Sequence, residues 1–250
     1  MARQRTPEGP PPAPTVQKLR IRYARRGRLR FSSTRDFARA LERALRRAGV
    51  PMAFSAGFHP HPRISYLGAA PTGAASEAEY FEISLAERAD PEKVRVALDA
   101  ALPPGLDILT CVEAGPGALA DRLEASVWEM RMSGVAPEAL AAVLEAYLSC
   151  DRAEVTRTFR TGPRTFDTRA AVLSLSASAA EEPGCAILRA VVRHTTPTVR
   201  PDDILTALRA LTSFTPPVAP VVTRLGQGPL IAGTDEVADP LAADLEVIGP

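Results

Sequence analysis

The sequence predicts an α+β fold, in which antiparallel strands and helices alternate in two successive halves of the chain. Three observations support this prediction. Short segments alternate apolar and polar residues, which is typical of strands with one buried face. Between them lie segments with apolar residues on one helical face, which begin at Ser, Thr, Asp or Pro residues that favour helix starts. A similar order of elements begins again after Gly115-Pro116-Gly117.

The first half is predicted over residues 17–114. Residues 18–23 alternate apolar and cationic side chains, so this strand should bury its apolar side and expose a face that is entirely cationic. Ser32-Ser33-Thr34 supplies hydroxyl caps for a helix that ends near Ala48. The remaining elements are expected to be a strand over residues 79–85, a helix from residue 90 to about residue 101, and a strand over residues 106–112.

The second half is predicted over residues 118–215. Its expected elements are a strand over residues 127–132, a helix over residues 137–148, a hairpin over residues 154–166, a strand over residues 186–192 and a helix over residues 201–211. This order suits a ferredoxin-like α/β sandwich with an antiparallel sheet in each half. Pro-rich residues 1–16 are expected to form a disordered leader. Residues 216–250, where Pro, Gly and Asp accumulate, are expected to form a mobile tail.

Composition limits the class of protein. At 250 residues and 46% hydrophobic, the chain can bury one large core or two smaller ones. It has no run of about 18 apolar residues, so no membrane span is expected, and its start has no apolar stretch of signal-peptide length. The three cysteines form no Cys-x-x-Cys pair and no iron–sulfur motif. We therefore expect a cytoplasmic protein with reduced thiols and no cofactor.

Charge is distributed unevenly along the chain, although the net charge is only +1. Residues 1–63 hold fourteen Arg and one Lys against three acidic residues, a net charge of +12, and the remainder carries −11. A cationic region of this density attracts phosphate groups. The sequence therefore predicts a polyanionic partner for the first quarter of the chain.

Arginines concentrate on one face of the first predicted helix, opposite its apolar side. Glu42 is the only acid on this helix after Asp36, so ion pairs within the helix cannot neutralise the face. Like charges at this spacing repel one another, which favours a polyanion partner over the alternative of a solvated face. The predicted phosphate-binding residues of the first strand and helix are Arg20, Arg22, Arg35, Arg39, Arg43 and Arg46.

The segment from Phe54 to Tyr66 is predicted to be a rigid recognition loop. Prolines at alternate positions exclude a regular helix, yet the segment carries two of the three histidines. Three interpretations stay open: contact with a phosphate or base, a metal or acid–base site built from His59, His61 and Glu79, and solvated histidines in a loop shaped by proline. The predicted RNA-recognition residues here are Phe58, His59, His61, Arg63 and Tyr66.

The predicted hairpin over residues 154–166 places arginines beside two phenylalanines. Arg160 and Arg164 are predicted to contact phosphates, while Phe159 and Phe166 stack on bases. The alternative is a hairpin whose phenylalanines are core residues and whose arginines face solvent. Elsewhere the sequence has no Gly-rich phosphate loop, no Gly-x-Ser-x-Gly and no His-Glu-x-x-His.

Several short motifs occur together in a fixed order. They are Leu19-Arg20-Ile21-Arg22-Tyr23, then Phe54 with Gly57-Phe58-His59-Pro60-His61-Pro62-Arg63-Ile64-Ser65, then Pro71-x-Gly73, Ser76 and Glu79-Tyr80, and finally Arg157, Gly162, Asp167 and Arg169. In this order they resemble the radical-SAM-linked conserved domain, a family of unknown function, over residues 17–215. At Thr72 that family usually has a large aliphatic residue, so local packing is expected to differ here.

The resemblance implies a partner and assigns no catalytic residue. Members of that family occur as free-standing chains or joined to the C-terminal side of a radical SAM domain, often encoded near ribonuclease E/G and ribosomal proteins. This chain lacks the three-cysteine cluster motif, so the radical SAM enzyme is expected to be a separate protein. We expect a non-catalytic accessory module that binds tRNA or ribosomal RNA and has no DNA specificity. The alternatives are an enzyme that uses His59, His61 and Glu79, and a protein–protein scaffold.

Overall fold

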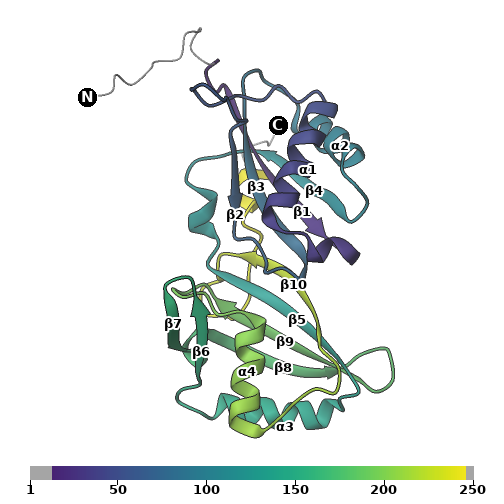
Figure 1. Ribbon diagram of the computed structural model, residues 1–250, viewed down its shortest axis with the longest axis vertical. Coiled ribbons are helices and arrows are strands. Elements are labelled where there is room, and N and C mark those ends of the chain that lie inside the picture. The colour runs from purple at the N-terminus through teal and green to yellow at the C-terminus, as the bar shows by residue number, and fades with distance from the viewer. Residues whose placement is uncertain (1–12, 246–250) are drawn as a thin grey trace, which may run out of the picture. The chain divides into compact units, whose positions relative to one another are not determined.

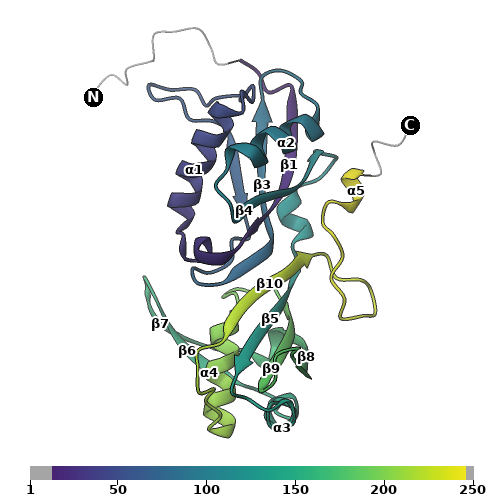
Figure 2. The same ribbon diagram turned by 90° about the vertical axis from the view of Figure 1, so that its right-hand side faces the viewer.

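The computed structural model describes residues 13–245, which form two compact units (Figures 1 and 2). Within the described residues, unit 1 consists of residues 13–72, 78–118 and 241–245, and unit 2 consists of residues 73–77 and 119–240. Most of the predicted leader lies outside the described residues. Each unit consists of more than one segment of the chain. The predicted division into two consecutive halves, with a boundary near residue 114, does not describe this arrangement.

Unit 1 is a four-stranded sheet with two helices on one side (Figures 1 and 2). Its strands lie in the order β4-β1-β3-β2, and the β1–β4 and β2–β3 pairs are antiparallel. Its elements are β1 (Gln17–Arg25), the 3-10 turn η1 (Gly27–Phe31), α1 (Thr34–Arg47), β2 (Ile64–Leu67), β3 (Ala75–Leu85), α2 (Pro91–Ala101), β4 (Leu106–Glu113) and the short C-terminal helix α5 (Ala242–Leu245).

The core of unit 1 lies between the sheet and the two helices. From α1, Phe37 and Leu41 are buried against apolar residues of β1 and β3, and the ring of Tyr23 stacks on Phe37 with centroids 4.3 Å apart. Burial of this apolar face stabilises the helix more than intrinsic propensity does. The predicted strand at residues 18–23 and helix from Thr34 are therefore confirmed, with the predicted apolar sides inward.

Unit 2 contains a second four-stranded sheet and a separate two-stranded hairpin. The sheet has the order β10-β5-β9-β8, and each neighbouring pair is antiparallel. Its elements are η2 (Leu119–Arg122), β5 (Ala125–Ser133), α3 (Pro137–Leu148), the hairpin strands β6 (Glu154–Phe159) and β7 (Gly162–Asp167), η3 (Arg169–Ala171), β8 (Val172–Ala179), β9 (Cys185–Arg193), α4 (Pro201–Thr212) and β10 (Val221–Gly228). The first residues of β3 pair in parallel with β10.

The architecture is mixed α/β with a mostly antiparallel sheet, as expected for the class. The prediction that residues 216–250 form a mobile tail is wrong for its described part. Residues 221–228 form β10, which pairs along its length with β5, and Leu241 is fully buried. The prolines nearest to β10, Pro220 and Pro229, lie just outside the strand, where a missing N–H costs no ladder hydrogen bond, whereas Gly226 and Gly228 lie within it and pair with β5.

The helices and cysteines agree with the expectations of no membrane span and of reduced thiols. No helix in the described part of the chain has the length and hydropathy that a membrane crossing requires. All three cysteines are free thiols, and burial raises the pKa of Cys111 to about 12. A thiol with so high a pKa stays protonated, which makes it a poor nucleophile.

Candidate nucleic-acid interface

Helix α1 presents a continuous row of exposed arginines. Ser33 caps the helix, because its hydroxyl accepts a hydrogen bond from the Asp36 N–H at 3.2 Å while the Ser33 N–H donates to the Asp36 carboxylate. Gly49, with φ of +65°, lies just beyond the other end. The exposed arginines of this row, on the side opposite the core, are Arg35, Arg39, Arg43 and Arg46; we call them the α1 arginine face.

The α1 arginine face carries almost uncompensated charge. None of its four residues takes part in an ion pair within residues 13–245. The Asp36 carboxylate is the negative charge that interacts with this face. Its hydrogen bonds to Ser33 lower its pKa, and the positive charges of Arg39 and Arg35 lower that pKa further. Arg47 differs, since it donates to the Ala101 carbonyl at the end of α2. The face is thus a free cationic surface of the type that binds phosphates.

An aromatic side chain adjoins the cationic region in η1. Phe31 is 60% exposed, and the guanidinium carbon of Arg30 lies 4.7 Å from its ring centroid. This pair can offer a stacking surface to a base. Phe31 is not among the residues predicted from the sequence to bind RNA. The available signal was an aromatic residue directly after the basic run that ends at Arg30.

The prediction that Arg20 is an exposed RNA-binding residue is wrong. Its side chain is only 2% exposed, and it donates to Glu82 at 2.9 Å and to Asp244 at 2.7 Å. Burial alone lowers the pKa of the guanidinium, but these bonds to Asp244 and Glu82 outweigh burial and raise it. Arg20 therefore serves as a buried structural cation. Arg22, two residues along the strand, is half-buried. The face of β1 that carries these arginines is therefore not fully exposed, contrary to the prediction.

The segment with His59 and His61 forms an ordered hairpin. At its base the Ala53 N–H donates to Ser84 O of β3 at 2.8 Å, and the Arg63 N–H donates to Ala53 O at 2.9 Å. Nearer the tip, the Ser55 N–H donates to His61 O and the His61 N–H donates to the Ser55 hydroxyl. Pro60 and Pro62 lack an N–H, so the pairing uses His61, which lies between them, and Arg63, which follows Pro62.

The tip of this hairpin exposes the side chains that the sequence analysis selected. Phe58 is 62% exposed, and His59 and His61 are also exposed. Phe54 on the opposite strand is 43% exposed. Arg63 is exposed at the base, and its guanidinium donates to the Thr15 hydroxyl at 3.4 Å. Two aromatic rings beside two imidazoles form a surface suited to stacking on unpaired bases.

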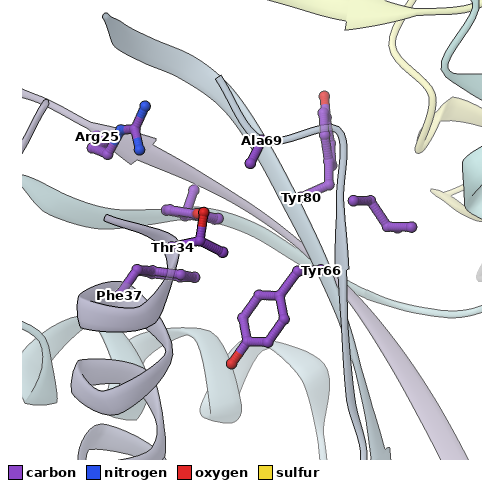
Figure 3. Close-up of a pocket in the computed structure, with 8 residues that line it drawn as sticks. Arg25, Thr34, Phe37, Tyr66, Ala69 and Tyr80 are labelled. Carbon is purple, nitrogen blue, oxygen red and sulfur yellow. The ribbon is translucent and has the colours of Figure 1, made fainter. Parts of the chain in front are cut away.

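Tyr66 belongs to the core rather than to the recognition surface, which corrects its assignment. Figure 3 shows its ring beside Phe37 of α1, and the two ring centroids are 5.9 Å apart in an edge-on arrangement. Burial, with the nearby Glu42 carboxylate, raises the pKa of Tyr66 to about 12. The cavity next to it, lined also by Arg25 and Tyr80, measures about 10 Å³. This volume holds about one water molecule, so a base cannot enter.

The metal interpretation of the same hairpin finds no support in the geometry. Glu79 is buried on β3, where its carboxylate accepts a hydrogen bond from the Ala70 N–H at 3.2 Å. Within residues 13–245, no group of three or more His, Cys, Asp or Glu side chains is arranged to hold a metal ion. The structure therefore does not bring His59, His61 and Glu79 together as a set of metal ligands.

In unit 2, the root of the β6–β7 hairpin is fixed by Arg157. Its guanidinium donates to Asp203 and to Thr198 O, and it lies 4.6 Å from the Phe159 ring centroid and 5.0 Å from that of Phe166. Asp203 also accepts the Arg200 N–H at the start of α4. Phe159 and Phe166 are half-buried around Arg157. They therefore resemble core residues, the alternative given for this hairpin, more than exposed rings that stack on bases.

The two predicted arginines of the hairpin are exposed near its turn. Arg160 lies at the turn itself, and Gly162 beside it has φ of +108°, a conformation that favours glycine. Arg164 donates to the Thr161 hydroxyl at 3.2 Å and lies 5.6 Å from the Phe159 ring centroid. Both guanidinium groups remain available to phosphates from this unit.

A serine–histidine pair in unit 2 is the nearest arrangement to a catalytic dyad. Ser126 Oγ lies 2.8 Å from His194 Nε2, and His194 Nδ1 lies 2.7 Å from Leu123 O. Ser126 is 1% exposed in the middle of the sheet, so a substrate has no access to its hydroxyl. Burial lowers the pKa of His194, with a smaller contribution from Arg224, and the hydrogen bond to Leu123 opposes them. We interpret the pair as structural.

Comparison with known protein families places most of the chain in one family. The profile of a bacterial family described as "Uncharacterized protein conserved in bacteria (DUF2344)" matches residues 18–201. This range includes the α1 arginine face, the histidine-bearing hairpin and the β6–β7 hairpin. No curated protein matches the chain.

Proposed function

The chain belongs to the DUF2344 family, and from this premise we propose that it is a non-catalytic, RNA-binding accessory module. The observation that carries the proposal is the α1 arginine face, four exposed guanidinium groups that have no ion-pair partner within residues 13–245. Keeping like charges together on one helix costs stability, and a phosphate backbone removes that cost. The acidic remainder of the chain disfavours indiscriminate binding.

RNA fits the exposed groups better than duplex DNA does. Beside the cationic face, unit 1 exposes aromatic rings at Phe31, Phe54 and Phe58. Unpaired bases of RNA loops stack on such rings, whereas bases inside a duplex cannot. Phe58, His59 and His61 would contact an unpaired region, Arg63 would contact an adjacent phosphate, and Arg160 and Arg164 would add contacts from unit 2.

The partner in this proposal is a separate radical SAM protein. The support is the resemblance of the motifs between residues 19 and 169 to the radical-SAM-linked domain, together with the lack of a cluster-binding cysteine motif in this chain. The module would bind tRNA or ribosomal RNA and present it to that enzyme in the cytoplasm. The radical SAM partner alone would catalyse the radical reaction.

The proposal also concerns the topology of the two sheets. We propose that the chain contains two ferredoxin-like halves, with the β6–β7 hairpin inserted in the second; the strand orders β4-β1-β3-β2 and β10-β5-β9-β8 support this. Such sheets often serve nucleic-acid binding through aromatic residues on the sheet. Here the exposed aromatics lie instead on η1 and the histidine-bearing hairpin, so we assign recognition to those loops.

A salt titration tests the proposal. The purified chain is titrated against total tRNA and against ribosomal RNA at about 50 and about 200 mM salt, where six phosphate contacts should weaken binding roughly a thousandfold. Duplex DNA of equal length serves as the competitor. Sub-micromolar RNA binding with this salt dependence supports the proposal. Absence of binding at the lower salt concentration contradicts it, and retention of a copurifying partner after nuclease treatment favours a protein scaffold instead.

A further inference from the structure

Unit 2 contains an open groove that the RNA proposal does not use. The groove has a volume of about 430 Å³, within the range of pockets that hold small molecules. It lies between one face of the sheet and the segment that follows β10. Its lining residues are Val127, Ser174, Ser176, Arg189, Val191, Asp235, Glu236 and Val237.

Strand register explains the floor of the groove. Val191 of β9 pairs with Val127 of β5 on one side and with Ser174 of β8 on the other. Two residues along β9, Arg189 pairs with Ser176. Because side chains two residues apart share a face of the sheet, the floor has an apolar end and a cationic end, with hydroxyl groups along one edge.

The opposite wall is acidic and ordered. The segment after β10 folds back on itself through the Ile231 N–H, which donates to Glu236 O at 2.9 Å, and the Ala238 N–H, which donates to Pro229 O at 2.9 Å. An isolated bridge between Leu230 and Val237 closes this turn. These bonds hold the backbone of this turn at the rim of the groove, where the exposed side chains of Asp235 and Glu236 line it.

The charges of floor and wall do not neutralise one another. Arg189 forms no ion pair within the described residues, even with Glu129, its neighbour across β5. Asp235 and Glu236 form none within residues 13–245 either. A cation and two carboxylates thus line one cavity without contact. Such an arrangement is prepared for a ligand that carries both charges.

We propose that this groove binds a small zwitterion of the amino-acid type. The carboxylate of the ligand pairs with Arg189 and accepts hydrogen bonds from Ser174 or Ser176. Its ammonium group pairs with the carboxylates of residues 235 and 236, and a short apolar side chain lies on Val127 and Val191. A polyanion does not fit, because the acidic wall repels it.

Three probes of one shape test the charge requirement. L-leucine carries both groups, 4-methylpentanoate lacks the ammonium, and 3-methylbutylamine lacks the carboxylate. We expect saturable binding of L-leucine by calorimetry or ligand-observed NMR, and binding at least about tenfold weaker for the other two, which is about 1.4 kcal/mol. Equal binding of 4-methylpentanoate, or no binding of L-leucine up to about 10 mM, overturns the proposal, since even weak sites have dissociation constants in the millimolar range.

Two substitutions locate the binding. Arg189→Ala and Glu236→Gln should each weaken L-leucine binding about tenfold. Arg193→Ala is the matched control, because Arg193 is an exposed arginine on the same strand that does not line the groove. Unchanged binding in Arg189→Ala, with native circular dichroism, contradicts the assignment. The groove and the α1 arginine face belong to different units and use different residues, so failure of one proposal leaves the other standing.

Discussion

Arg20 and Asp244 form a buried ion pair between residues 224 positions apart in the sequence. Their side chains are 2% and 0% exposed, and Arg20 Nη1 lies 2.7 Å from Asp244 Oδ1. The same carboxylate oxygen accepts the Gly115 N–H at 3.0 Å. A Cβ at position 115 would lie 2.7 Å from it, so glycine is required for this approach. The pair therefore fixes the C-terminal segment to unit 1.

Removing one partner of this pair should strongly destabilise unit 1. In Asp244→Ala, the Arg20 guanidinium keeps Glu82 but loses a charged partner in a site that water does not reach. We expect a loss of about 3–5 kcal/mol in the free energy of unfolding, as is typical when one member of a buried pair is removed. Urea denaturation followed by circular dichroism measures it. The exposed carboxylate variant Glu87→Gln is the control, and a loss below about 1 kcal/mol for Asp244→Ala would show that water reaches Arg20.

Charge reversal on the α1 arginine face should abolish RNA binding without unfolding the protein. In Arg39→Glu with Arg43→Glu, two phosphate contacts become repulsions, and we expect RNA affinity to fall at least about a hundredfold at low salt. Gel-shift titration gives the affinity, and thermal unfolding shows that the fold persists.

The control for this experiment is Arg193→Glu with Arg209→Glu. Both residues are exposed in unit 2, and this double variant changes the net charge of the chain by the same amount. If both double variants bind RNA equally weakly, net charge rather than the α1 arginine face determines affinity, and the proposed interface is wrong.

The sequence predicted the local elements of unit 1 well, because their signals are local. The cap at Ser33 and the apolar face of α1 lie within the helix itself. The role of Arg20 was not predictable in this way. Alternation along β1 places it opposite Leu19 and Ile21, but only the fold brings Glu82 and Asp244 to it. Pattern alone cannot distinguish a strand face covered by a distant segment from one open to solvent.

The other differences between prediction and structure have the same cause, which is contact between segments distant in the sequence. Tyr66 was grouped with its exposed neighbours in sequence, although β2 turns its ring toward Phe37. β10 was missed because the residues around it are typical of loops, while its place in the sheet depends on pairing with β5. The exposed tip of the histidine-bearing hairpin was predictable, since adjacent prolines and glycine exclude regular structure there.

Arg157 should determine the order of the β6–β7 hairpin. Arg157→Lys removes the planar guanidinium that donates to Asp203 and Thr198 while it packs on two rings, and an ammonium group cannot do both. We expect the free energy of unfolding to fall by about 2 kcal/mol and amide exchange over residues 154–167 to become faster. Hydrogen exchange with mass spectrometry measures this. Arg160→Lys at the exposed turn should leave exchange unchanged, and similar effects from both variants would contradict the anchoring role.

Acidification should weaken unit 2 through His194. Because burial lowers its pKa in the folded state, the unfolded chain binds more protons between the two pKa values. The stability contributed by the neutral imidazole is complete above a pH of about 6.5 and decreases as the pH falls below it. Denaturation midpoints between pH 7.5 and pH 5 should fall more steeply for the wild type than for His194→Gln. Equal slopes would mean that His194 does not titrate differently on folding.

The capping pair at the start of α1 gives a prediction with its own pH dependence. Ser33→Ala removes the hydroxyl that caps the helix and should cost about 1 kcal/mol at neutral pH. The pKa of Asp36 is lowered in the folded state by Ser33, so its contribution is present above the usual carboxyl range and is lost as the pH falls through the lowered value. The difference in unfolding midpoint between wild type and Ser33→Ala should therefore shrink in acid, and a constant difference would exclude this linkage.

The contact between β1 and α5 also constrains the order of folding events during synthesis. Unit 1 begins with β1, yet its buried cation is compensated fully only after residue 244 has been added. Domains usually fold as their own segment leaves the ribosome, but here β1 gains one partner of its buried cation only when residue 244 has left the ribosome. A nascent chain that stops at residue 118 contains Arg20 without Asp244, so unit 1 lacks one partner of its buried ion pair until α5 has been synthesised.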